Sequence, residues 1–392
     1  MVEHTRAHAT TRRTGDRSTP AERDAMRRAL DAALRGPRSR NPQVGCLLLA
    51  ADGAVLSEGR HRGAGTPHAE IDALAGADPA RVRGATAVVT LEPCNHTGRT
   101  GPCSRALADA GVARVVFASR DPGGASAGGA EALRRAGVDV VDLAAEAEAE
   151  TETADAASAS GLDSASAVPT AHALAARADE LIAPWAVAHA LGRPHVTLKW
   201  AQSLDGRAAA ADGTSQWISG PESRADVHER RAQADAIVAG TGTILADDAA
   251  LTARNPDGSL RDEQPVPVVV GTRPIPATAR VRSHPHEPIL AVPDERGLRG
   301  VLDDLEDRGL HRVLVEGGPT LASAFLAAGL VDRILVYQAP IVLGGPRTAT
   351  GDAGVATLAA APRFAFTNVR RLGDDLLLVA EPPSPSHARS DA

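Results

Sequence analysis

The sequence predicts an α/β protein with two folded domains, and three observations support this prediction. Apolar, strand-like runs alternate with helical patterns over residues 20–145, which is the arrangement of an α/β layered domain. The same alternation returns between residues 195 and 381. Between the two regions, residues 143–170 are acidic and rich in Ala and Ser, with few large apolar side chains, as in a linker.

The 392-residue chain is therefore expected to consist of five segments. They are a disordered tail (1–18), a first domain (19–145), an acidic linker with a connecting helix (146–190), a second domain (191–382) and a second tail (383–392).

Composition is typical of a soluble globular protein in a reducing compartment. The formal net charge is −7, and no sustained basic run lies beyond the extreme N-terminus, which argues against nucleic acid as the main partner. The 3 cysteines provide no disulfide framework, so the cytoplasm is the expected location. Neither a secretory signal nor a membrane span is predicted, because the first 18 residues are polar and no apolar run reaches about 18 residues.

The first domain opens with a clear helix start. Thr19 suits the cap, Pro20 suits the first helical position, and Glu22 completes a capping box. Further helices are expected at 68–75, 102–110 and 130–136, and strands at 44–50, 55–59, 85–91, 112–118 and 138–143. Cys46 lies in the apolar run of the first strand and is expected in the core.

A cluster of metal-ligand residue types organises this domain. His68, Cys94 and Cys103 offer one imidazole and two thiolates within 36 residues, which is the ligand set of a catalytic zinc with an open fourth position. Glu70 is then free to carry protons between a zinc-activated water and a leaving amine, as in zinc nucleobase deaminases. The general deaminase signature has two residues between its cysteines, whereas eight separate Cys94 from Cys103.

Two questions about this cluster remain open from the residues alone. A closed structural zinc would take His61 or His96 as its fourth ligand, and Glu70 would then have no role. Residues two apart on a regular helix also face away from each other, so His68 and Glu70 share a pocket only at an irregular helix start.

The alternation of strand-like and helical segments in the second domain predicts a mostly parallel sheet. A connecting helix is expected at 173–190, and helices at 221–234 and 321–328. Strands are expected at 195–201, 235–240, 266–271, 288–292, 312–316, 333–339 and 376–381, with a short extended piece at 215–219.

Two glycine-rich turns suggest a nucleotide site. The turn at residues 240–245 begins like a dinucleotide fingerprint but has Leu245 in place of the third glycine, so alone it is weak. At Gly317-Gly318 a buried strand ends and a helix begins, which suits a phosphate. A plain tight turn is the alternative.

Several motifs occur in one order along both halves of the chain. They are His68-Ala-Glu70, Glu92-Pro-Cys94 through Cys103, Lys199-Trp-Ala-Gln-Ser-Leu-Asp205-Gly206, Ser215-Gln-Trp217-Ile218, Asp247-Asp248, Leu251-Thr-Ala-Arg254 and Glu316-Gly-Gly-Pro-Thr-Leu-Ala322. Together they resemble one family, the bacterial bifunctional deaminase/reductases of riboflavin biosynthesis. The resemblance covers roughly residues 20–380, and the eight-residue gap between cysteines is that family's own spacing.

The resemblance implies a cytidine-deaminase-like layered domain followed by a dihydrofolate-reductase-like α/β domain. The first would remove the 2-amino group of 2,5-diamino-6-(5-phosphoribosylamino)pyrimidin-4-one with Zn²⁺. The second would use NADPH to reduce the ribosyl group of the product to ribityl. The implied partner is this small molecule, with no nucleic acid and no membrane, and a homo-oligomer stays open.

The resemblance also assigns roles by position. His68, Cys94 and Cys103 would bind zinc, and Glu70 would be the proton shuttle. Cofactor contacts would come from Ala201, Trp217, Thr243, Asp247, Thr272, Gly318, Pro319, Thr320, Leu321, Ala322, Ser323 and Ala324. Substrate contacts would come from Asn41, Arg99, Lys199, Ser215, Arg231, Leu251, Arg254 and Glu316.

Several of these assignments have simpler alternatives. Arg231 could form a surface salt bridge, Arg254 could be a solvated loop charge, and Lys199 could pair with Asp205 as a structural ion pair. A proton-transfer role for Asp247 is a hypothesis.

Three departures from the family pattern limit the resemblance. Gly271 stands where the family usually has Asp, Ala250 replaces the usual Pro, and the linker is an insertion. The competing hypotheses are a deaminase whose second domain no longer reduces, and a zinc-stabilised interaction module that would tolerate loss of Glu70.

Overall fold

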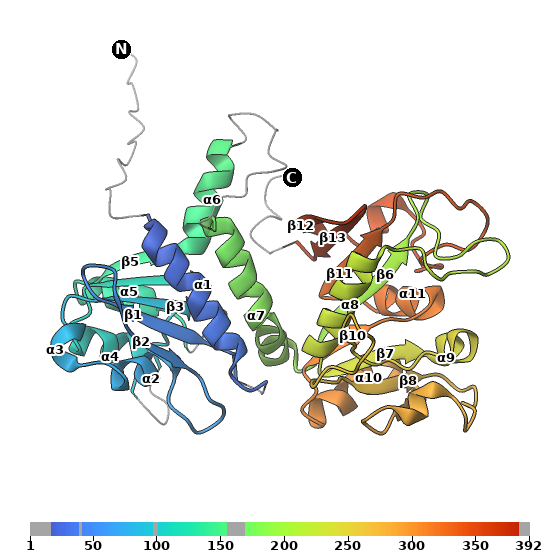
Figure 1. Cartoon of the computed structure of the whole chain (residues 1–392), viewed down its shortest axis with the longest axis horizontal. Helices are drawn as coiled ribbons and strands as arrows, with labels where there is room; N and C mark the ends of the chain where they lie inside the picture. Colours follow the sequence, from blue (N-terminus) through green and yellow to red (C-terminus); the bar gives the residue numbers. More distant parts are fainter. Residues whose placement is uncertain (1–16, 39–40, 97–100, 125, 155–168, 384–392) are drawn as a thin grey trace, which may run out of the picture. The chain divides into compact units, whose positions relative to one another are not determined.

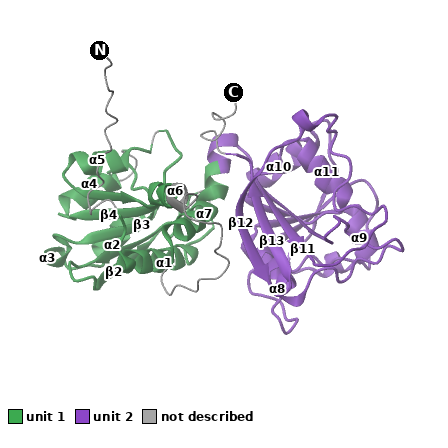
Figure 2. Cartoon of the chain, turned by 90° about the horizontal axis from the view of Figure 1, so that it is seen from above, with its two compact units in different colours: residues 1–186 green, residues 187–392 purple. Residues whose placement is uncertain are grey.

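The computed structural model describes residues 17–38, 41–96, 101–124, 126–154 and 169–383. It divides the chain into two compact units, Met1–Ala186 and Val187–Ala392, which fold around separate cores (Figure 2). No helix among the described residues is long and apolar enough to cross a membrane.

Unit 1 is built on a five-stranded sheet in the order β2-β1-β3-β4-β5 (Figure 1). Its strands are β1 (Gly45–Leu49), β2 (Val55–Arg60), β3 (Thr86–Leu91), β4 (Arg114–Ser119) and β5 (Asp139–Asp142). Strand β1 runs antiparallel to both its neighbours, whereas β3, β4 and β5 are parallel. The carboxyl ends of β3 and β4 therefore lie at the same edge of the sheet.

Helices cover both faces of this sheet. They are α1 (Pro20–Leu34), α2 (Ala69–Ala75), α3 (Pro79–Val82), α4 (Cys103–Asp109), α5 (Gly129–Arg135), α6 (Leu143–Ala154) and α7 (Ala171–Leu191). Alternate residues of a strand point to opposite faces, so Cys46 and Leu48 pack with α2, α4 and α5. Leu47 and Leu49 pack with α1 and the start of α7. The predicted core position of Cys46 is confirmed, since its side chain is fully buried.

The predicted capping box opens α1. The Glu22 amide donates to Thr19 Oγ1 at 3.2 Å, and the Thr19 amide donates to Glu22 Oε2 at 2.7 Å. Ser18, at the end of the predicted tail, donates its amide to Glu146 Oε2 at 2.9 Å, and residues 1–16 lie outside the described part of the chain.

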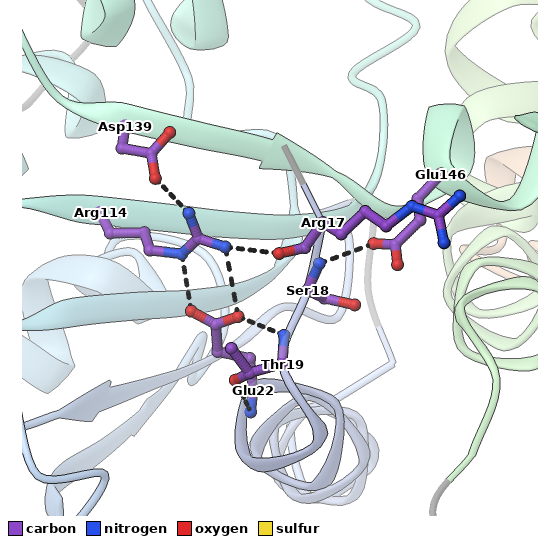
Figure 3. Close-up of polar contacts among 7 residues, drawn as sticks. All are labelled: Arg17, Ser18, Thr19, Glu22, Arg114, Asp139 and Glu146. Atoms are coloured by element: carbon purple, nitrogen blue, oxygen red, sulfur yellow. Dashed lines mark hydrogen bonds and ion pairs between the residues drawn. The ribbon is translucent and has the colours of Figure 1, made fainter. Parts of the chain in front are cut away.

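A partly buried arginine joins the start of α1 to the sheet (Figure 3). Arg114, at the start of β4, donates to Glu22 Oε1 at 2.7 Å and to the Arg17 carbonyl at 2.8 Å, and it also contacts Asp139 of β5. The Glu22 side chain is only 7% exposed, so it depends on this cation for charge balance.

Replacing Arg114 with Leu is expected to loosen α1 and β4. The buried Glu22 carboxylate would lose its cationic partner, at a cost of about 1–3 kcal/mol in the free energy of unfolding of unit 1. Hydrogen exchange of peptides from α1 and β4 should accelerate, while exchange in unit 2 stays unchanged. Arg105→Leu is the matched control, because both side chains of the Arg105–Asp109 pair are more than 70% exposed. Equal protection in both variants would contradict the prediction.

Unit 2 contains an eight-stranded sheet in the order β12-β13-β11-β6-β10-β7-β8-β9. Its strands are β6 (His195–Gln202), β7 (Ala236–Gly240), β8 (Val266–Val270), β9 (Ile289–Ala291), β10 (Arg312–Val315), β11 (Arg333–Gln338), β12 (Ala365–Leu372) and β13 (Asp375–Glu381). The run from β11 to β9 is parallel, and the β12–β13 hairpin adds an antiparallel edge. The predicted mostly parallel sheet is confirmed.

Helices of unit 2 connect the parallel strands. They are α8 (Pro221–Gln233), α9 (Thr241–Asp247), α10 (Gly297–Asp307) and α11 (Pro319–Ala327), with short 3₁₀ turns η1 (Arg280–Ser283) and η2 (Leu358–Ala360). The main core lies between the sheet and α10 and α11, and includes Leu302, Leu305 and Phe325.

Some local features differ from the sequence predictions. Residues 215–219 form turns and not an extended piece. The linker is expected to be helical in part at most, and it begins with helix α6, whose Ala/Glu-rich stretch has high helix propensity. Residues 155–168 lie outside the described chain. Helices α3, α9 and α10 and strand β12 were not predicted, and residues 241–247, expected as part of a glycine-rich turn, form α9.

Candidate functional site

The first site includes the start of α2, where the helix begins irregularly. His68 precedes the helix and has an extended backbone, with φ −65° and ψ 160°. Its carbonyl still accepts the Asp72 amide at 2.9 Å. Because His68 lies outside the first helical turn, the two-residue spacing no longer turns it away from Glu70. His68 is therefore the N-cap residue of α2 and not part of its first turn.

Two cysteines from later segments face His68. Cys94 follows β3, and Cys103 is the first residue of α4. Their Sγ atoms lie 3.6 and 3.3 Å from His68 Nδ1, and one ligand atom from each of the three residues lies within 4.8 Å of the others. This set of one imidazole and two thiols fits zinc with a fourth position left for water or substrate.

The Cys94 loop is held by the segment that follows β4. Buried Glu92 accepts the Ala130 amide at 2.9 Å and the Asp121 amide at 3.3 Å. At the start of α5, Gly129 approaches the Pro93 carbonyl so closely that a Cβ would lie 1.7 Å from that oxygen. Only glycine permits this approach, which fixes the backbone directly before Cys94.

Burial and hydrogen bonding set the charges of the first site. Burial raises the pKa of Glu70 to about 7. A hydrogen bond from Cys103 and another with His68 lower the pKa of Cys94 to about 4, while the bond to Cys94 and burial raise the pKa of the Cys103 thiol. The hydrogen bond with Cys94 raises the pKa of His68. The three donors thus form one polar cluster around a point that suits a divalent cation.

The closed-zinc alternative lacks a fourth ligand among the described residues. The metal cluster contains His68, Cys94 and Cys103 and no further His, Cys, Asp or Glu. Both nitrogens of His61 have neighbours, Asn41 Nδ2 at 3.1 Å and the Pro67 carbonyl at 3.3 Å. An open catalytic position therefore fits the described geometry better than a closed site.

Removing zinc with a chelator is expected to expose the ligand thiols. Cys94 should then react with a maleimide, because its hydrogen bonds favour the nucleophilic thiolate. Mass spectrometry of the labelled peptides would measure the reaction, and added zinc should reverse it. Cys46 is the internal control, since its side chain is fully buried in the core. Equal Cys94 labelling before and after chelation would contradict zinc ligation.

The second site lies in unit 2, at the ends of adjacent parallel strands. Glu316 follows β10 and pairs with Arg231 of α8 through two bonds, Nε to Oε1 at 2.7 Å and Nη2 to Oε2 at 2.8 Å. Lys199 Nζ from β6 lies 3.8 Å from Glu316 Oε2. Burial alone would raise the pKa of Glu316, but Arg231 and Lys199 outweigh it and lower the pKa to about 2. Burial lowers the pKa of Lys199.

The contacts in this cluster exclude the simpler alternatives for Lys199 and Arg231. Lys199 pairs with Glu316 and not with Asp205, which accepts the Leu343 and Gly344 amides at 3.0 and 2.7 Å. The Arg231–Glu316 pair is no surface salt bridge, because the two side chains are only 20% and 9% exposed.

Arg254 is also anchored and is not a free loop charge. Its Nε donates to Thr252 Oγ1 at 3.1 Å, and its Nη1 donates to the Gly258 carbonyl at 2.9 Å. Arg231 Nη1 donates to the Thr252 carbonyl at 3.0 Å. Both arginines therefore contact the same short segment. Leu251, just before it, is buried and has a left-handed backbone, φ 56°.

The two glycine-rich turns meet each other. The Gly318 amide donates to Thr243 Oγ1 at 3.1 Å, which joins the start of α11 to α9. A Cβ at Gly317 would lie 2.7 Å from the Leu321 side chain, so close packing at this turn requires glycine. Within α11, Leu321, Ala322 and Ser323 are buried, and Ser323 Oγ has no hydrogen-bond partner among the described residues.

The other predicted site residues are not joined to these clusters by the described polar contacts. Trp217 is 69% exposed and stacks on Arg224, with 4.8 Å from the guanidinium carbon to the ring centroid. Burial raises the pKa of Asp247. Ala201 packs against Tyr337 and Leu377. The other predicted site residues without such a contact are Ser215, Thr272, Pro319, Thr320 and Ala324. Arg99 lies outside the described residues.

The departure at Gly271 has a local structural reason. Gly271 has φ +137°, and a Cβ there would lie 2.6 Å from Thr241 Oγ1. A side chain at this position is therefore strained, and an Asp contact of the family type is absent here. Ala250 has no feature that explains its exchange for Pro.

One residue of the second site was missed from the sequence. His228 accepts the Arg254 amide through Nδ1 at 3.3 Å. The available signal was its position three residues before Arg231 on an expected helix, which places both side chains on one face.

Comparison with known proteins assigns each unit to a class. Residues 20–119 match the cytidine and deoxycytidylate deaminase zinc-binding region, and residues 194–378 match the RibD C-terminal domain. Together with the open zinc-ligand set, these matches define a two-domain enzyme, a zinc-dependent deaminase followed by a dihydrofolate-reductase-like reductase domain.

Relatives along the whole chain narrow this class to one family. The riboflavin biosynthesis protein RibD of Mycobacterium tuberculosis (strain H37Rv) is 44% identical over 355 residues, covering 88% of this chain and 92% of its own. RibD of Escherichia coli (strain K12) is 37% identical, with 90% and 97% covered. The Acinetobacter baumannii RibD structure is 34% identical, with a TM-score of 0.66 and 93% and 99% covered. The chain belongs to the RibD family, the bifunctional deaminase/reductases of riboflavin biosynthesis.

Proposed function

We propose that unit 1 deaminates 2,5-diamino-6-(5-phosphoribosylamino)pyrimidin-4-one and that unit 2 reduces the ribosyl group of the product to ribityl with NADPH. A 28%-identical Thermotoga maritima structure, with a TM-score of 0.67 and 93% of this chain covered, is named as a diaminohydroxyphosphoribosylaminopyrimidine deaminase/5-amino-6-(5-phosphoribosylamino)uracil reductase. The observation that carries the proposal is the presence of both polar clusters in one chain. The reduced cytoplasm suits the thiol ligands.

In unit 1 the proposed proton carrier is Glu70. When bound by His68, Cys94 and Cys103, zinc supplies a Lewis acid that brings the pKa of water near neutrality. Glu70 takes a proton from the attacking water and returns it to the departing amine. Burial raises the pKa of the Glu70 carboxyl group above its usual range, which suits a group that must both accept and return a proton.

In unit 2 the chain's own residues bind and orient the reactants. NADPH, held at Thr243 and the turn from Gly318 to Ala324, supplies the hydride when bound. Arg254 offers a guanidinium fork for the substrate phosphate. Lys199 and Glu316 form a charged pair, with 3.8 Å between Nζ and Oε2, that is proposed to contact the substrate. Asp247 is proposed to aid proton transfer to the sugar oxygen.

A coupled assay tests the proposal. Purified, zinc-loaded protein would receive the diaminopyrimidinone phosphate, and ammonia release and NADPH oxidation would be followed together, with NADH as the comparison. Both signals are expected, with ammonia release independent of NADPH. Ammonia without NADPH oxidation would favour a deaminase whose reductase domain is inactive, and neither signal would overturn the proposed substrate.

A further inference from the structure

His228 lies inside the second site without an assigned role. It is on α8, three residues before Arg231, so the two side chains share one face of the helix. The Arg254 amide donates to His228 Nδ1 at 3.3 Å, and Arg231 Nη1 donates to the Thr252 carbonyl at 3.0 Å. Helix α8 therefore holds the backbone of residues 252–254 at two points.

The segment held in this way is otherwise rigidly bonded. Gln264 accepts the Ala253 amide at 2.9 Å and donates to the Ala253 carbonyl at 2.8 Å. The Arg254 side chain is braced by Thr252 Oγ1 and the Gly258 carbonyl. Among the described residues, His228 is the acceptor for the Arg254 amide. Loss of this acceptor would leave the Arg254 amide without its hydrogen bond, and the backbone from which the Arg254 side chain extends would be less well fixed.

The surroundings keep the imidazole neutral, so that Nδ1 remains an acceptor. Burial lowers the pKa of His228 to about 4, and the charges of Arg231 and Arg254 act in the same direction. Glu316 and a hydrogen bond with the Thr252 backbone act in the opposite direction and are outweighed. A neutral imidazole accepts through one ring nitrogen, whereas a protonated one only donates.

We propose that His228 is a positioning residue of the reductase site, which fixes the Arg254 backbone so that the guanidinium meets the phosphate of the substrate. This inference rests on the proposed phosphate contact of Arg254. His228 itself touches neither substrate nor cofactor in this role. Its effect should therefore appear in KM for the phosphoribosyl substrate and leave kcat nearly unchanged.

Two variants of the full-length, zinc-loaded protein test the role. His228→Leu removes the acceptor, and we expect KM of the reductase step to rise by about tenfold, the size of one lost buried hydrogen bond. His228→Asn keeps an acceptor atom at the Nδ1 position and should restore most of the affinity. Inorganic phosphate, used as a competitive inhibitor, should show the same order of affinities. Ammonia release by unit 1 is the internal control, and His286→Asn is the matched control, since His286 is exposed.

Arg254→Gln separates the two possible failures. If it raises KM while His228→Leu does not, the phosphate contact stands and the positioning role is overturned. If Arg254→Gln has no effect on KM or on inhibition by phosphate, the proposed contact fails and the inference fails with it. Equal defects in His228→Leu and His228→Asn, or a fall in kcat alone, would also overturn the positioning role.

Discussion

Glu70→Gln is expected to reduce ammonia release by a factor of about 10²–10⁴, the usual contribution of a positioned general acid–base group. Glutamine keeps the size and the hydrogen-bonding capacity of the side chain but cannot carry a proton. The Glu70 side chain is buried beside the zinc ligands, and burial raises its pKa to about 7, so no exposed carboxylate can replace it. NADPH oxidation with the deaminated product should remain unchanged, because unit 2 folds around its own core.

Two controls show whether a loss of ammonia release comes from the missing carboxyl group: the zinc content of the variant and a matched substitution elsewhere in unit 1. The Glu70→Gln protein should still bind one equivalent of zinc, since Glu70 is not among the three grouped ligands. Glu58→Gln is the control, because Glu58 is a partly exposed carboxylate of unit 1 that pairs with Arg35. A Glu70→Gln protein that contains zinc and releases ammonia at the normal rate would show that another group carries the proton.

The residue types of the zinc site could be predicted from the sequence, but its local geometry could not. Donor identity and the adjacent strand and turn signals were sufficient to select His68, Cys94 and Cys103. The extended backbone of His68 depends on where α2 begins, and helix boundaries are uncertain by one or two residues. That single residue decides whether Glu70 shares the pocket. The support that Glu92 and Gly129 give to the Cys94 loop could not be predicted from the sequence either, because both residues act through tertiary contacts.

The second site shows a different limit. Lys199, Arg231 and Glu316 come from β6, α8 and the end of β10, and β6 and β10 become neighbours only in the folded sheet. A sequence pattern offers several counter-charges for Lys199, and only the sheet order selects Glu316. Whether Arg254 is braced or solvated likewise depends on Thr252 and Gly258.

Two of the missed elements, β12 and α10, have separate causes. Strand β12 is exposed along nearly its whole length, so it has no alternating apolar pattern and depends on its pairing with β13. Helix α10 does have an apolar stripe, formed by Val301, Leu302 and Leu305, but glycines at its first and fourth positions weaken the helical signal.

Glu316→Gln is expected to abolish reduction and to destabilise unit 2 by about 3–5 kcal/mol, because Arg231 and Lys199 would remain buried without their counter-charge. Glu316 is 9% exposed and receives two bonds from Arg231. Calorimetry of the full chain would measure the loss, with the transition of unit 1, recognised by its shift on zinc removal, as the internal reference. Asp294→Asn is the matched control, since both side chains of the Arg296–Asp294 pair are half exposed and such a surface pair should contribute little to stability.

The dependence of this effect on pH provides the sharper test. The pKa of Glu316 falls from 4.5 to about 2 in the folded chain, so the ionised form stabilises unit 2 fully above pH 4.5. That stability is lost as the pH falls from 4.5 towards 2, because the unfolded chain takes up the proton first. Glutamine does not titrate, so the difference in stability between wild type and Glu316→Gln should be largest near neutral pH and shrink through this window. A difference that stays constant with pH would show that Glu316 stabilises unit 2 by packing and hydrogen bonding and not by its charge.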